Sequence, residues 1–225
     1  MNSDVEMRCA AIVGLGRRRK FYLGAVQGLK QRLVAYARGA FGFSGDASDA
    51  DREKTSARAL ALVEALIAGK PAAEKDAEIA EAIIDEALAV HIGLEQLTGR
   101  RKDVERDMVK VVRALPVHEW AKGVRGLGDI GLAVVVAEAG DLAKYPHYKM
   151  LWKRLGLAPY DGHAMSTWRA KGGLSADEWT SAGYSPRRRA EIYACVGVSL
   201  AFCQLRSAGK SGTEYGEPLG PYGEA

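Results

Sequence analysis

The sequence of 225 residues predicts an all-α fold in which long helices precede a smaller helical domain. Two observations lead to this prediction. Apolar residues recur every three or four positions over long stretches, which is the period of one helix face, and strand-like alternation of apolar and polar residues is scarce. In addition, 48% of the residues are hydrophobic, enough for one well-packed domain with an appendage.

The first predicted segment, residues 1–45, is basic and helical. A helix is expected over residues 21–41, where apolar side chains follow helical spacing at Leu23, Val26, Leu29 and Leu33. Its other side is basic. A run of three arginines comes before this helix, at Arg17, Arg18 and Arg19. Such a run either contacts a nucleic-acid backbone or forms a solvated helix start.

The second segment, residues 46–116, is predicted to be a helical hairpin or coiled-coil region. Asp46 or Ser48 is expected to cap its first helix, which Gly69 and Pro71 end. A longer helix is expected from Ala73 until Pro116 ends it. It carries eleven consecutive seam positions at strict three–four spacing, namely Ala80, Ile83, Ala87, Val90, Leu94, Leu97, Arg101, Val104, Met108, Val111 and Leu115.

This seam has two interpretations. Ten apolar positions and one arginine favour a hairpin or a homodimer through residues 73–115, with Arg101 fixing the register. The alternative is a long helix packed inside its own domain. Additional apolar residues support the alternative because they widen the stripe, at Ile79, Ile84, Leu88 and Ile92.

Charge is segregated along the chain. The net charge is +6 over residues 1–45, −4 over 46–116, +4 over 117–206 and −2 over the tail. Basic zones of this kind indicate contact with a polyanion or a solvated face. Three scattered cysteines predict no disulfide framework and no metal site. No cofactor is expected. No run of about 18 apolar residues occurs, so we expect no membrane span and a cytoplasmic protein.

Three glycines, Gly126, Gly128 and Gly131, match the G-x-G-x-x-G pattern of dinucleotide-binding loops. That interpretation requires a preceding strand and an acidic residue about 20 positions downstream. The preceding text is instead a short helix after Pro116, and "HYKMLWK" lies at the downstream position. The context therefore argues against a dinucleotide site.

The better interpretation is a helix–hairpin–helix within residues 117–206. Gly126 and Gly128 permit a positive φ and close approach of a ligand to the backbone. The helix that follows offers free N–H groups and its positive end to a phosphate. Nearby cations are expected to reinforce the site, at Lys122, Arg125 and Lys144. Such a site reads backbone shape and charge rather than base sequence. The alternative is a tight turn that binds nothing.

Three motifs in order, "GLGDIGLAVVVAEAGDL", "LWKRLGLAP" and "SPRRRAEIYACVG", complete a resemblance. Residues 75–205 resemble the C-terminal region of DEDD-type insertion-sequence transposases, whose DNA targeting uses a bridge RNA. The resemblance implies a nucleophilic serine in the loop after the GLAP motif, and Ser166 matches it. Such a serine needs nearby cations and a base or water to take its proton, and the candidates for these roles are Arg169, Lys171 and His163. Thr167 departs from the family, which usually has glycine there. Ser175 is instead expected to form a capping box.

The N-terminal segment departs further from the family. The resemblance implies an RNase H-like nuclease domain there, yet residues 1–70 are helical and carry few acids before Asp46. We therefore expect a nucleic-acid-binding protein related to these transposases that acts on DNA or on structured RNA, and any enzymatic role is uncertain. One alternative is a serine-dependent recombinase subunit whose nuclease domain is supplied in trans. Another is a helical scaffold without nucleic-acid binding.

Two features remain at the C-terminal end. Arginines in the first turn of a helix oppose its dipole, so an anionic partner is expected at Arg187, Arg188 and Arg189. Residues 207–225 lack apolar periodicity and predict a disordered tail.

Overall fold

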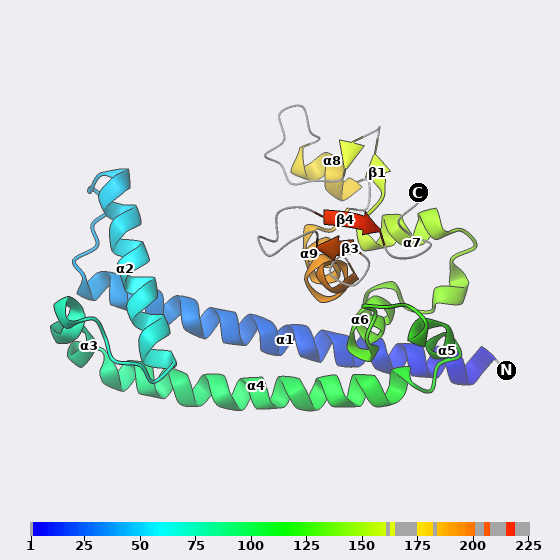
Figure 1. Ribbon diagram of the computed structural model, residues 1–225, viewed down its shortest axis with the longest axis horizontal. Coiled ribbons are helices and arrows are strands. Elements are labelled where there is room, and N and C mark those ends of the chain that lie inside the picture. Colours follow the sequence, from blue (N-terminus) through cyan, green and yellow to red (C-terminus); the bar gives the residue numbers. More distant parts are fainter. Residues whose placement is uncertain are drawn as a thin grey trace. The chain divides into compact units, whose positions relative to one another are not determined.

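The computed structural model describes residues 2–160, 163–164, 175–181, 184–200, 205–207 and 215–218. Its fold is all-α, as predicted, with two short strand pairs near the C-terminal end (Figure 1). The chain divides into two compact units. We call Arg18–Asp103 the central unit, and Met1–Arg17 together with Val104–Ala225 the terminal unit. The divisions between these units fall after Arg17 and after Asp103, whereas the sequence placed them after residues 45 and 116. They fall within helices because two long helices each contribute to both units.

The central unit contains most of α1 (Asn2–Ala40), then α2 (Asp49–Ile67), a 3-10 turn η1 (Glu74–Asp76), α3 (Ala77–Ala82) and the first two thirds of α4 (Ile84–Val112). The Ser48 side chain caps α2 by accepting a hydrogen bond from the Asp51 amide at 3.2 Å, which confirms one of the two expected caps. After α2 ends, Gly69 adopts a φ of +63°, a conformation that suits glycine.

The core of the central unit joins α1, α2, α3 and α4. Its buried members are Leu33, Ala37, Ala59, Leu62, Val63, Ala80, Ile83 and Ala87. The seam residues at the start of α4 are therefore covered by their own chain, as the packed-helix alternative predicts. Ile84, Leu88 and Ile92 stay outside this core and are 48%, 57% and 49% exposed.

The helix expected from Ala73 onward is interrupted, which corrects the sequence prediction. α3 ends at Ala82, Ile83 follows it with a φ of −119°, and α4 starts at Ile84. The Ile83 side chain is 1% exposed, so the break keeps it in the core. Before α3, the Arg58 guanidinium bonds the buried carboxylate of Asp76, with 2.8 Å between Nε and Oδ1. Tertiary contacts at both points outweigh the local helical pattern.

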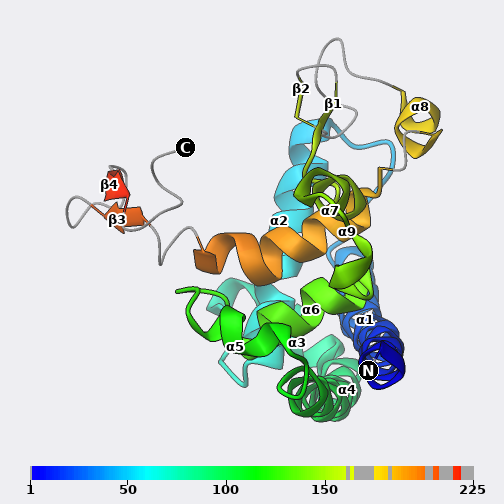
Figure 2. The same cartoon turned by 90° about the vertical axis from the view of Figure 1, so that its right-hand side faces the viewer.

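The terminal unit is built around α6 (Asp129–Ala139). Around it lie α5 (Val117–Lys122), η2 (Leu142–Lys144), α7 (Tyr148–Leu155), α9 (Pro186–Ile192) and a π-helical turn η3 (Tyr193–Gly197) (Figure 2). The short helix α8 (Ala176–Ser181) stands away from α6. α6 packs against α5, α7, α9 and η3. Because it is apolar on nearly every side, most of its residues are buried, among them Leu132, Val134 and Val136.

α1 also packs closely on α6 within the terminal unit. A methyl group added to Gly16 of α1 would lie 2.5 Å from the Cβ of Ala137 on α6. No side chain fits at that distance without movement of one helix. Glycine at this position therefore allows the two helices to approach each other.

Short strands complete the described chain. β1 (Pro159–Tyr160) pairs with β2 (His163–Ala164), and β3 (Leu205–Ser207) pairs with β4 (Tyr215–Pro218), both antiparallel. β4 lies within the tail that was predicted to be disordered, which corrects that prediction. A ladder of three or four residues is too short to produce a recognisable period in the sequence. None of the described helices combines the length and apolar character that a membrane span requires.

Candidate nucleic-acid interface

The turn between α5 and α6 has the compact form expected of the glycine motif. The amide of Gly123 donates to the carbonyl of Trp120, that of Val124 to Ala121 and that of Leu127 to Val124. Gly126 has a φ of +90°, a conformation that L-residues rarely adopt. Six residues therefore join the two helices.

The three glycines of the motif have different roles. Gly126 supplies the positive φ of the turn. Gly128 caps α6 with extended backbone, φ −74° and ψ 168°, so the positive φ that the sequence suggested there is wrong. A Cβ added to Gly128 would meet nothing within 4 Å. Gly131 is buried, and its added Cβ would lie 3.3 Å from Leu127 Cδ1 and 3.7 Å from the carbonyl oxygen of Cys195, so a larger residue there would crowd Leu127.

The N-terminus of α6 is open to a ligand on its Gly128 side. The first amides of an α-helix have no acceptor within the helix, and the first bond that closes here runs from Leu132 N to Gly128 O. Gly128 is exposed. Backbone N–H groups at a helix N-terminus, beside a glycine without a side chain, form a suitable place for a phosphate oxygen.

A carboxylate that sequence reasoning missed lies at the same helix end. Asp129 accepts a hydrogen bond from Arg113 Nε at 2.6 Å, and its Oδ1 lies 2.9 Å from Nε2 of the buried His118. These two bonds hold the pKa of Asp129 below its ordinary value. The signal in the sequence was an acidic residue at the first helical position, where it complements the helix dipole.

Of the three cations predicted around the turn, the structure places two beside it and one beyond the other end of α6. Lys122 and Arg125 are exposed and flank the turn, and Lys122 pairs with Glu119 at 2.7 Å. This pair lowers the pKa of Glu119. Lys144 lies beyond the other end of α6, roughly 16 Å away at 1.5 Å per residue. There it pairs with Glu6 at 3.1 Å, which raises the pKa of Lys144. Lys144 therefore does not belong to the turn.

The three arginines of α9 also separate. Arg188 Nε lies 3.4 Å from a carboxylate oxygen of Glu138, whose side chain is 5% exposed, and Arg188 donates to the carbonyl of Arg154 at 2.8 Å. Its partner is thus an internal carboxylate, which corrects the expectation of an external anion. Arg189 lies over the ring of Tyr193, and Arg187 is exposed. Ser185 caps the helix by accepting from the Arg188 amide.

The arginine run on α1 is likewise mixed. Arg17 and Arg18 are exposed, whereas Arg19 is 8% exposed. Arg17 belongs to the terminal unit, and Arg18 and Arg19 belong to the central unit. Arg17 and Arg18 remain candidates for contact with an anion, whereas burial removes most of Arg19 from solvent.

The candidate catalytic loop lies outside the described residues, including Ser166, Arg169 and Lys171, and only the backbone of His163 is described. Ser175 forms the predicted capping box, because its amide donates to Glu178 Oε2 at 2.7 Å and its hydroxyl accepts from the Glu178 amide. These bonds lower the pKa of Glu178. Across the ranges that the structure describes, no group of three or more His, Cys, Asp or Glu residues could hold a metal ion.

Comparisons with known proteins found no matching family model, no similar curated protein and no similar solved structure.

Proposed function

We propose that the protein binds nucleic acid, with DNA as the first candidate, through the turn between α5 and α6, and that it self-associates through its long helices. In this proposal it is a relative of the insertion-sequence transposases that its C-terminal motifs resemble. One observation carries the proposal. Gly128 presents open, exposed backbone at the N-terminus of α6, next to the sharp turn at Gly126.

The charges around the turn support a phosphate rather than a neutral ligand. Lys122 and Arg125 flank the turn, and both are exposed. Asp129 opposes an incoming anion, but the guanidinium of Arg113 offsets its charge, and His118 Nε2 lies within hydrogen-bond distance of its carboxylate. A phosphate oxygen that accepts from the α6 amides would contact backbone, so this grip has no base specificity.

The first experiment is binding to duplex DNA, a four-way junction and a folded RNA over a salt series. Affinity should fall steeply with salt, with a slope of roughly 0.9 per phosphate contacted on duplex DNA. The order of the three affinities identifies the shape that is recognised. If no ligand binds more tightly than roughly 100 μM, the limit of weak non-specific contact, the turn has only a structural role.

The Gly128→Val variant tests the site itself. A Cβ added to Gly128 meets nothing within 4 Å, so we expect the fold to persist while the branched side chain obstructs the α6 amides. Loss of charge-assisted hydrogen bonds worth about 1.5–3 kcal/mol corresponds to roughly 10- to 150-fold weaker binding. Gly45→Val is the matched control, because Gly45 is also an exposed loop glycine with open space around it. Equal affinities of the two variants would refute the phosphate grip.

A further inference from the structure

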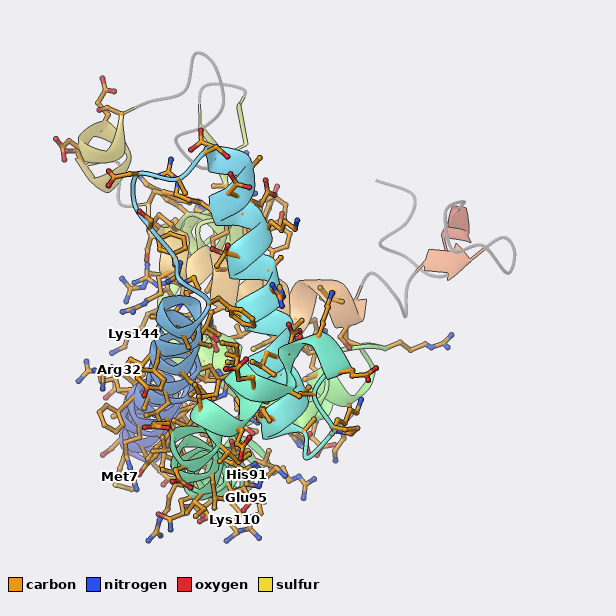
Figure 3. The ribbon with its side chains drawn as sticks, turned by 90° about the vertical axis from the view of Figure 1, so that its left-hand side faces the viewer. Met7, Arg32, His91, Glu95, Lys110 and Lys144 are labelled. Carbon is orange, nitrogen blue, oxygen red and sulfur yellow. The ribbon has the colours of Figure 1, made fainter. Side chains whose placement is uncertain are left out.

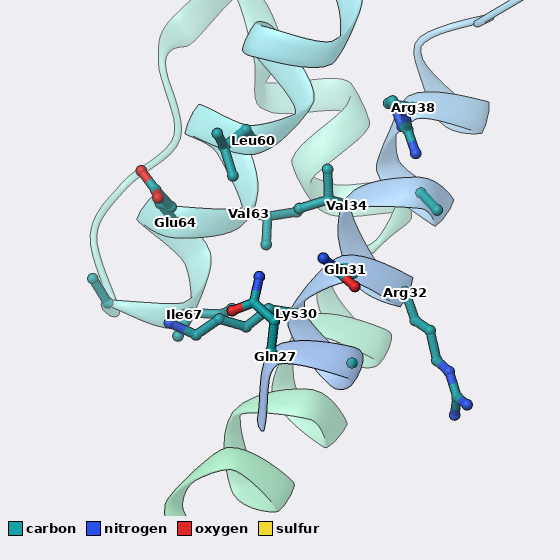
Figure 4. Close-up of a pocket in the computed structure, with 13 residues that line it drawn as sticks. Gln27, Lys30, Gln31, Arg32, Val34, Arg38, Leu60, Val63, Glu64 and Ile67 are labelled. Atoms are coloured by element: carbon teal, nitrogen blue, oxygen red, sulfur yellow. The ribbon is translucent and has the colours of Figure 1, made fainter. Parts of the chain in front are cut away.

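An elongated groove lies between the second half of α1 and α2 in the central unit (Figure 4). Its volume is about 940 Å³, and its α1 side extends from Gln27 to Arg38. Twelve helical residues span roughly 18 Å, or three turns. The groove is therefore long enough to receive three turns of another helix.

The groove has an aliphatic floor and a cationic rim. Val34, Val63 and Ile67 are floor residues, and Leu60, 46% exposed, stands beside them. Lys30, Arg32 and Arg38 supply three positive charges to the rim, against the single carboxylate of Glu64. Figure 4 shows Lys30 extending toward Ile67, with Arg32 and Arg38 on the α1 side. An occupant that fits must be apolar on one side and acidic at its edges.

A second feature of the same unit has these properties. Ile84, Leu88 and Ile92 are spaced four residues apart on α4, which places them along one side of the helix. They are about half exposed. We call these three residues the α4 stripe. Exposed acids accompany it at Glu81, Asp85 and Glu95. Glu95 lies 3.7 Å from His91, on the same part of α4 (Figure 3).

The segment that supplies the α1 side of the groove and the segment that carries the α4 stripe differ in charge, although Arg19 and Asp76 are buried. Residues 18–38 contain six lysines and arginines and no acid. Residues 74–99 contain seven acids and one lysine. Each central unit therefore carries one basic and one acidic surface, and a second central unit offers the complement of both.

A nucleic-acid strand fits the groove less well than such a helix. Among the described residues that line it there is no aromatic side chain, so these residues offer bases no stacking platform. Its aliphatic floor also offers nothing to phosphates. Helix-in-groove recognition, by contrast, uses apolar anchors at helical spacing, which the α4 stripe provides.

We propose that the groove is filled by the α4 stripe of a second copy of this chain, and that the two copies exchange this contact about a two-fold axis. Each copy then contributes one groove and one stripe, as an isologous dimer requires. The inference rests on the self-association part of the proposed function and names its surface. The seam of α4 lies in the intramolecular core, so the stripe is the apolar face that remains available.

Two matched substitutions test the pairing. Leu60→Gln makes the groove polar, and Leu88→Gln does the same to the stripe; glutamine has a helix propensity similar to that of leucine. Each change affects both contacts of a two-fold dimer. We expect the dissociation constant, measured by sedimentation velocity, to rise about 30-fold for each variant. Phe21→Gln is the control, because Phe21 is 69% exposed in the same unit and does not line the groove.

Mixing the two variants gives the sharper test. The Leu88→Gln chain keeps its groove and the Leu60→Gln chain keeps its stripe, so a heterodimer retains one intact contact. Both substitutions then fall in the other contact, where one glutamine already removes the packing of Leu60 on Leu88, so the second glutamine costs little. The mixture should therefore associate more tightly than either variant alone. Circular dichroism must show that both variants keep the helix content of the unsubstituted protein.

Three outcomes would overturn the inference. If the unsubstituted chain is monomeric at all concentrations, self-association fails together with it. If the chain dimerises but neither variant weakens the dimer, the groove and the stripe are not its interface and only this inference fails. If Leu60→Gln reduces binding of duplex DNA and leaves the dimer intact, the groove belongs to nucleic acid. Nucleic-acid binding by Gly128 is measured separately and is unaffected by these results.

Discussion

Gly16 provides the sharpest test of how the terminal unit is held together. An alanine methyl there would lie 2.5 Å from Ala137 Cβ, whereas nonbonded carbon atoms prefer about 3.5–4.0 Å. α1 or α6 must therefore move by about 1 Å, and overpacking of this kind typically costs about 1–3 kcal/mol. The same substitution also replaces a helix-interior glycine by alanine. This replacement on its own stabilises a helix by about 1 kcal/mol.

Gly14→Ala separates these two effects. Gly14 lies one half-turn earlier in α1, and its added Cβ meets nothing within 4 Å, so this variant receives only the gain in helix propensity. We expect the free energies of unfolding of Gly14→Ala and Gly16→Ala to differ by about 1–3 kcal/mol, with Gly16→Ala the less stable. Urea unfolding followed by circular dichroism measures this difference. Adding Ala137→Gly to Gly16→Ala should restore part of the loss. Equal stabilities of the two alanine variants would refute the close packing of α1 on α6.

Two further predictions concern charges in the terminal unit. Arg188→Met removes a cation from the buried Glu138 carboxylate and should lower the free energy of unfolding by about 3 kcal/mol. The control is Arg187→Met, at an exposed position, which should change the free energy of unfolding by less than about 0.5 kcal/mol. Similar losses for the two variants would contradict an internal role for Arg188. Asp129→Asn should lower the free energy of unfolding at neutral pH. The pKa of Asp129 is lowered in the folded protein, so its ionised carboxylate stabilises the fold, and this contribution is lost as the carboxylate is protonated. The difference in unfolding free energy between the variant and the unsubstituted protein should therefore narrow as pH falls below about 4. A gap that stays constant with pH in chemical unfolding would contradict the role of its ionised carboxylate.

Much of the fold follows from local sequence signals. Ser48 and Ser175 cap helices where a serine lies three positions before an acidic residue, and Gly69 follows the end of α2. These features depend on a few neighbouring residues, so the sequence alone determines them. Three seam positions, Ala80 on α3, Ile83 between α3 and α4, and Ala87 on α4, are buried together in one core. The coiled coil inferred from the seam stays a prediction.

The sequence does not reveal which surface covers a seam. A three–four spacing is the same whether the partner helix comes from another chain or from α1. The break at Ile83 has a similar origin, because it depends on core contacts with residues far away in the sequence. Arg188 shows the same limit for charges, since its partner Glu138 is 50 positions earlier and on another helix. Long-range pairing determines these features, and local patterns do not encode it.

Asp129 decides how the candidate interface must work. In the free protein its carboxylate already lies at the positive end of α6 and holds Arg113 and His118. A phosphate that approaches from the open Gly128 side reaches the same helix end. The phosphate and the Asp129 carboxylate therefore repel each other and compete for the positive end of the helix dipole. Binding therefore costs less when Asp129 loses its charge. Asp129→Asn, although less stable, should bind duplex DNA more tightly, with a salt slope larger by roughly 0.9 if Arg113 turns to a phosphate. Unchanged affinity would mean that the phosphate lies elsewhere than at the α6 N-terminus.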